Sequence, residues 1–233
     1  MIEYYILGII LLPGLLLSIY AQLKVNGTYN KYNEVNSEYD RPAHEIARKF
    51  LDQAGLQDIE VIQTRGHLTD HYNHRKKYIA LSEGVYNSTS ISAIGVACHE
   101  VGHAIQYKDN YLPIKLRNFL IPICNVANNF LWILIILGFL FFYTNFGMAF
   151  VLTGTIIFAL SVLINLVTLP VEYDASKRAL DLLNKNTIFN EYEIKSTKEV
   201  LNSAALTYVA GLVVSILNLV RLLLVLFSNS RKD

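Results

Sequence analysis

The sequence predicts a mainly α-helical membrane protein with several spans and a small α+β domain at the membrane surface. Hydrophobic residues make up 53% of the 233 residues and charged residues only 17%, a composition too apolar for an ordinary soluble domain. Four apolar stretches are each long enough for a helix to cross a bilayer, which takes about 20 residues. The formal net charge of +1 indicates no basic surface for nucleic acid.

The four predicted spans differ in what surrounds them. Residues 4–23 lack the positive start and the small-residue cleavage site of a signal peptide, so we interpret them as a retained anchor. Residues 126–143 and 148–169 are joined by four uncharged residues and form a tight hairpin. In the last span, residues 204–227, Arg221 is costly unless it reaches an interface or faces other helices.

These spans divide the chain into five predicted parts. They are an N-terminal anchor at 1–23, an α+β domain at 24–118, a transmembrane hairpin at 119–170, a helical segment at 171–203, and a C-terminal span with its tail at 204–233. The helical segment is expected to hold two helices joined near residues 184–186. Because the hairpin crosses the membrane twice, the parts before and after it must share one face of the bilayer.

The α+β domain is predicted from its turn and capping residues. The run Asp40-Arg41-Pro42 opens a helix that ends at Gly55. Short strands at 59–62 and 77–81 lie on either side of a polar loop at 66–74. A second helix follows, with candidates for its N-cap among residues 87–90.

This second helix carries a His-Glu-x-x-His motif. His99 and His103 are four residues apart, so both rings lie on one helical face and can bind one metal ion. Glu100 lies about 100° round the helix, close enough to take a proton from a water at the metal. Apolar residues at helical spacing predict the buried side of the helix: Ile94, Ala97, Val101 and Ile105. The motif therefore indicates a zinc hydrolase rather than a solvated charged patch.

A catalytic zinc site normally has three protein ligands and a water, so one ligand must come from elsewhere on the same membrane face. Pro170 is placed to start a helix with Glu172 and Asp174 in its first turns. Acidic residues at such a place also simply complement the helix dipole. His71 and His74 in the polar loop are competing candidates, although a lone loop histidine is more often a surface residue.

Four stretches resemble the YugP-type neutral zinc metallopeptidases of bacterial membranes. They read GHLTDHY at 66–72, GVACHEVGHAIQ at 95–106, TLPVEYDAS at 168–176 and AALTYVA at 204–210. That family is similar to the gluzincins, in which a Glu on a later helix completes the site, often as E-x-x-x-D. The resemblance implies a zincin-like metallopeptidase domain with one zinc ion. The resemblance also implies which residues form the site: His99, His103 and Glu172 as the zinc ligands and Glu100 as the general base.

The chain departs from these patterns at two positions. Ser176 stands where the gluzincin pattern has an Asp, so either Ser176 or Asp174 is expected to support a ligand histidine. Asn73 stands where the closer family has an Asp. The neighbouring His71 and Tyr72, together with His74, form the polar cluster that we expect to stabilise the oxyanion.

The predicted function is therefore a membrane-embedded zinc metalloendopeptidase that acts on peptides or membrane proteins. A zinc-dependent hydrolase of a non-peptide amide or ester is an alternative, and so is a membrane scaffold with a structural zinc. Structural sites usually close with four protein ligands, often Cys, whereas Cys98 and Cys124 are interpreted as small buried residues.

The location of the site follows from residues that flank the spans. Tyr, Lys and Arg at 107–117 suit the headgroup level, so the site is expected close to the surface of a bacterial plasma membrane. Basic residues on the catalytic side favour its cytoplasmic face, with both termini outside: Lys24, Lys115, Arg117, Lys177 and Arg178. The sequence leaves the oligomeric state open.

Overall fold

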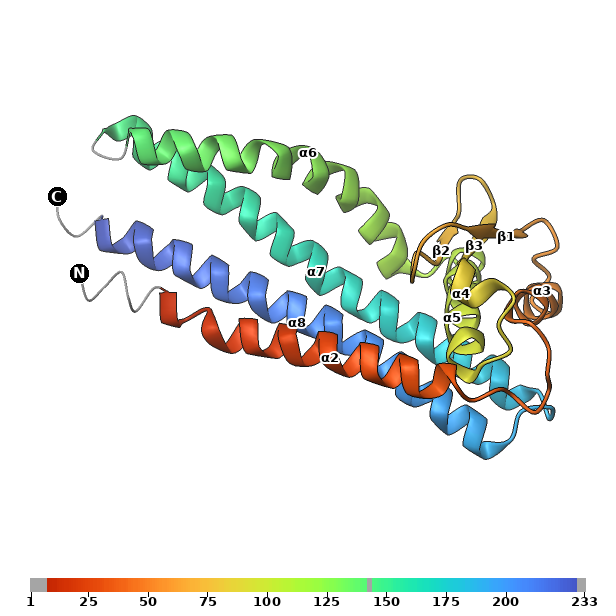
Figure 1. Ribbon diagram of the computed structural model, residues 1–233. Helices are drawn as coiled ribbons and strands as arrows, with labels where there is room; N and C mark the ends of the chain where they lie inside the picture. Colours follow the sequence, from red (N-terminus) through yellow and green to blue (C-terminus); the bar gives the residue numbers. More distant parts are fainter. Residues whose placement is uncertain (1–7, 142–143, 230–233) are drawn as a thin grey trace. The chain divides into compact units, whose positions relative to one another are not determined.

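The computed structural model describes residues 8–141 and 144–229, which are mainly helical with a small sheet (Figure 1). The elements in chain order are α2 (Leu12–Asn33), α3 (Ala43–Gln53), β1 (Glu60–Thr64), β2 (His71–Asn73), β3 (Tyr78–Ser82), α4 (Glu83–Tyr86), α5 (Ile91–Lys108), α6 (Leu112–Leu140), α7 (Asn145–Lys185) and α8 (Glu191–Asn229). The predicted helix after Pro42 and both predicted strands are confirmed.

The chain divides into two compact units. The long-helix unit contains Met1–Tyr20, Lys115–Leu169 and Tyr208–Asp233, and the mixed unit contains Ala21–Ile114 and Pro170–Thr207. The mixed unit holds the sheet, α3, α4 and α5 together with the second part of α7 and the first part of α8. The five-part division made from the sequence stays a prediction.

Three described helical segments are long and apolar enough to cross a membrane, namely Leu112–Gly138, Phe146–Lys185 and Glu191–Leu224. They contain most of the second, third and fourth predicted spans. The first predicted span, residues 4–23, lies partly outside the described residues, and α2 begins at Leu12.

The structure corrects the prediction that a new helix starts at Pro170. Pro170 lies inside α7, which continues without a break to Lys185. Proline removes one backbone N–H, but helices of membrane proteins tolerate this loss. Pro122 likewise lies inside α6, which begins at Leu112, earlier than the predicted span. The expected helix junction near 184–186 is confirmed by the end of α7.

The sheet of the mixed unit has the strand order β1-β3-β2. β1 is parallel to β3, with Val61 opposite Ile79, whereas β2 is antiparallel to β3, with Tyr72 opposite Ile79. The structure thus corrects the prediction of a loop throughout 66–74. A strand of three residues is too short to show the alternation of apolar and polar residues that predicts a strand. Its hydrogen bonds to β3 form only once the chain has folded.

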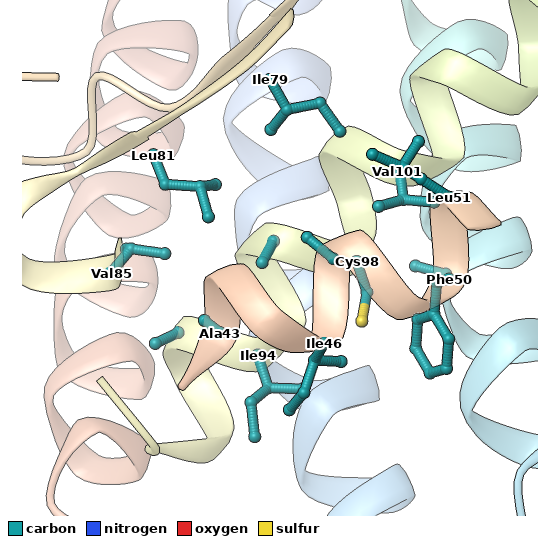
Figure 2. Packing of buried hydrophobic residues seen from close by; sticks show 14 of the residues in the cluster. Ala43, Ile46, Phe50, Leu51, Ile79, Leu81, Val85, Ile94, Cys98 and Val101 are labelled. Atoms are coloured by element: carbon teal, nitrogen blue, oxygen red, sulfur yellow. The ribbon is translucent and has the colours of Figure 1, made fainter. Parts of the chain in front are cut away.

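The helix α5 is fixed by its N-cap and by the core beneath it. Ser90 accepts a hydrogen bond from the backbone N–H of Ala93, which confirms the predicted cap. Figure 2 shows how α5 packs on α3 and β3, and the buried side chains there include Ile46, Phe50, Leu51, Ile79, Leu81, Ile94, Cys98 and Val101. Burial of the predicted apolar face holds the opposite face of α5 in place for the motif.

Cys98 and Cys124 are both buried, as predicted. Cys98 is completely inaccessible within the core around α5, and burial raises the pKa of its thiol. A thiol that stays protonated is a poor metal ligand, so the core side of α5 contributes packing rather than chemistry.

Candidate metal centre

Two helices of the mixed unit bring two imidazoles and one carboxylate together. His99 and His103 lie on α5 and Glu172 lies on α7. Glu172 Oε2 is 3.2 Å from His99 Nε2 and 3.5 Å from His103 Nε2. The side chains are 3% exposed for Glu172, 11% for His103 and 17% for His99. A carboxylate is therefore enclosed between two ring nitrogens, and His99 is the most exposed of the three side chains.

The three side chains fit a zinc ion by their chemistry and by their spacing. One ligand atom from each residue lies within 4.8 Å of the others. Imidazole nitrogen and carboxylate oxygen bind zinc at about 2.0–2.2 Å, so tetrahedral ligand atoms stand roughly 3.3 Å apart. The two observed distances of 3.2 and 3.5 Å to Glu172 Oε2 lie close to that value. The side chains would need little movement to bind the ion.

The electrostatics of the cluster also favour a cation. Burial alone raises the pKa of the Glu172 carboxyl, but hydrogen bonds with His103 and His99 hold it below its usual range. Burial lowers the pKa of the His103 imidazole, whereas its hydrogen bond with Glu172 and the charge of Glu100 raise it overall. A buried carboxylate remains ionised only beside positive charge, which protonated imidazole or a metal ion can supply.

Glu100 lies beside this cluster and is largely buried. It follows His99 directly on α5, and its negative charge acts on the His103 ring. The structure thus places the proposed base in the same enclosed environment as the three candidate ligands.

Ser176 and Asp174 support different histidines. Ser176 Oγ lies 3.1 Å from His99 Nδ1, so a hydroxyl stands where the gluzincin pattern has a carboxylate. Asp174 instead accepts a hydrogen bond from Gln106 Nε2 at 2.9 Å, and Gln106 Oε1 lies 3.0 Å from His103 Nδ1. Sequence reasoning missed Gln106, although an amide three residues after His103 in an apolar helix was a visible signal.

The loop residues proposed from the sequence lie outside the group of three. His71 is exposed, and its Nδ1 is 2.9 Å from the Thr69 carbonyl oxygen. His74 stacks on Tyr107, with ring centroids 4.5 Å apart, and Tyr72 packs edge-on against the same ring at 5.5 Å. Tyr107 follows His103 by one helical turn, so the contact of Tyr72 with Tyr107 lies one turn beyond the histidine pair along α5.

Gly102 is a second residue that sequence reasoning missed. A Cβ at this position would lie 2.3 Å from the backbone oxygen of Ala175 on α7. The missing side chain therefore lets α5 and α7 approach closely enough for Glu172 and Ser176 to reach the histidines. Glycine inside a helix is unfavourable by about 1 kcal/mol, and its presence within the motif was the available signal.

Replacement of Gly102 by alanine is expected to force α5 and α7 apart. A backbone oxygen cannot move aside as a flexible side chain can, so we expect the free energy of unfolding to fall by about 1–3 kcal/mol. Thermal unfolding of the detergent-purified protein measures the change. Gly27→Ala is the matched control, since a Cβ there meets nothing within 4 Å. Equal or higher stability of Gly102→Ala would contradict the close approach.

Comparison with known proteins agrees with this geometry. Residues 7–227 match the profile of a family described as "Putative neutral zinc metallopeptidase". The chain is 40% identical over 217 residues to the "Putative membrane protease YugP" of Bacillus subtilis (strain 168), across 93% of this chain and 94% of that protein. No solved structure matches the chain. The membrane protease relative and the three membrane-length helices both indicate membrane association. With nearly the whole chain matched, the protein belongs to the family of putative neutral zinc metallopeptidases.

Proposed function

We propose that the protein is a membrane-embedded zinc metalloendopeptidase of the His-Glu-x-x-His, gluzincin-like kind. His99, His103 and Glu172 hold one zinc ion, and Glu100 is the general base. The observation that carries the proposal is the position of Glu172 Oε2, within 3.5 Å of both histidine Nε2 atoms. Three protein ligands leave room for a water, as catalytic zinc sites do and closed structural sites do not.

In this proposal the protein residues divide the chemistry between them. Zinc, when bound, lowers the pKa of a water ligand to about 7 and polarises a carbonyl group. Glu100 takes the proton of the attacking water and passes it to the leaving amine. Tyr72 is the candidate hydrogen-bond donor to the oxyanion, because its phenol is protonated at neutral pH and its ring packs on Tyr107, which follows His103 by one helical turn.

The proposed substrates are peptides and membrane proteins near the bilayer surface. α5 ends at Lys108 and α6 begins at Leu112, so only three residues separate the helix of the motif from a membrane-length helix. Tyr111 and Lys115 suit the headgroup level. From the basic residues that flank the spans, we propose that the site is at the cytoplasmic face.

Cleavage of peptides by the full-length protein in detergent should depend on zinc. We expect a chelator to abolish cleavage of a fluorogenic peptide library and added Zn²⁺ to restore it, because the three ligands bind a single exchangeable ion. Parallel assays with ester and non-peptide amide substrates separate a peptidase from a more general hydrolase. Cleavage that persists in the metal-stripped protein, or no cleavage of any peptide by the zinc-loaded protein, would overturn the proposal.

A further inference from the structure

Gln106 is completely buried, and both ends of its amide have partners. Its Nε2 donates to the backbone oxygen of Val171 at 2.7 Å and to Asp174 Oδ2 at 2.9 Å. Its Oε1 lies 3.0 Å from His103 Nδ1. The side chain therefore connects the second histidine of the motif to α7 at two points.

The partners of Gln106 determine which way its amide points. A backbone oxygen and an ionised carboxylate can only accept hydrogen bonds. The opposite orientation would place Oε1 against both acceptors in a buried site, where such a contact is costly. Gln106 must therefore direct its NH₂ group at Val171 and Asp174, and its oxygen at His103.

This orientation determines the tautomer of His103. An amide oxygen accepts, so His103 Nδ1 must carry the proton that it donates to Gln106. When the ring is neutral, this is its single N–H, so Nε2 keeps a lone pair. That Nε2 is the atom that faces Glu172, at 3.5 Å. A ring nitrogen lone pair and a carboxylate oxygen at this distance need a cation between them, which is a bound metal ion or, without metal, a proton on Nε2.

The amide is held in turn by charged groups on both helices. Arg178 Nε donates to Asp174 Oδ2 at 2.6 Å, and Arg178 also forms an ion pair with Asp109 at the end of α5. Charge-assisted hydrogen bonds of this kind are among the stronger ones in proteins. His99 has no comparable support, because the Ser176 hydroxyl can donate or accept and so does not select a tautomer.

We propose that Gln106 is a positioning residue that fixes His103 in the Nδ1–H tautomer, and that Asp174, Arg178 and Asp109 hold Gln106 in the required orientation. The proposal rests on the proposed function, in which His103 Nε2 binds zinc. In this proposal the tautomer of His103 is fixed before metal binds, so its Nε2 is the metal-binding atom. The tautomer of His99 is not fixed by its hydrogen-bond partner.

The tautomer can be measured in the metal-free protein by ¹⁵N NMR of histidine-labelled full-length chain in detergent. The spectra are recorded at increasing pH, and in the neutral form of the ring we expect His103 to carry its single proton on Nδ1. Gln106→Met keeps the length of the side chain and removes the acceptor, so this preference should be lost. Gln53→Met, an exposed change on α3, is the matched control and should leave the His103 signals unchanged. The His103 signals are assigned by their absence from His103→Asn.

Zinc affinity gives the second readout, by competition with a chromophoric chelator. Gln106→Met is expected to weaken zinc binding about 10- to 100-fold, as loss of a residue that orients a ligand typically does, and Gln53→Met should not. An Nε2–H tautomer of His103 in the wild-type protein overturns the proposal even if the variant fails to fold. An unchanged tautomer and affinity in folded Gln106→Met overturn it as well, while zinc-dependent cleavage by the wild type would leave the proposed function standing. A wild-type protein that has the expected tautomer but binds no zinc refutes the proposed function instead.

Discussion

Glu100→Gln is expected to slow peptide cleavage severely while zinc binding remains intact. Glutamine has nearly the shape of glutamate but cannot take up a proton from the attacking water. A positioned general base contributes about 10²- to 10⁴-fold to the rate, so we expect kcat to fall by that factor. His99, His103 and Glu172 are unchanged in the variant, and zinc should bind with an affinity close to that of the wild type.

The measurement compares turnover of one fluorogenic peptide with the zinc content of the same preparation. Glu60→Gln is the matched control, because Glu60 is exposed on β1 in the mixed unit. Its turnover should equal that of the wild type. If Glu100→Gln cleaves the peptide as fast as the wild type, another group is the base. If it loses zinc as well, Glu100 has a structural part in the site that the proposal does not give it.

The features that could be predicted from the sequence are local ones. The spacing of four residues between the two histidines fixes their relation on one helix, and Ser90 caps that helix as its position before an apolar stretch predicts. Long apolar stretches predict helices of membrane length from composition alone. The prediction of Glu172 as a ligand needed one further argument. The hairpin crosses the membrane twice, and only this return places Glu172 on the same side of the membrane as the motif.

The features that could not be predicted depend on contacts between distant segments. β2 exists because β3 lies beside it, and nothing in three polar or aromatic residues signals that neighbour. Pro170 is tolerated inside α7, where local rules place a helix start. Gly102 and Gln106 matter because of Ala175, Val171 and Asp174 on another helix, and no pattern within α5 reveals those partners.

Glu172→Gln is expected to remove most of the zinc affinity, since it replaces the proposed anionic ligand, which lies between the two histidines, with a neutral amide. We expect the affinity to fall by more than about 100-fold, beyond the loss typical of a residue that only orients a ligand. The buried amide also leaves the two imidazoles without their counter-charge. Thermal unfolding of the metal-free variant checks that the mixed unit still folds.

The role of Glu172 as the third zinc ligand is therefore tested by zinc titration of the detergent-purified wild type, Glu172→Gln and Glu60→Gln against a chromophoric chelator. We expect one tightly bound zinc per chain in the wild type and in Glu60→Gln, and more than about 100-fold weaker binding in Glu172→Gln. A folded Glu172→Gln protein that binds zinc as tightly as the wild type would contradict it, because the third ligand would then lie elsewhere.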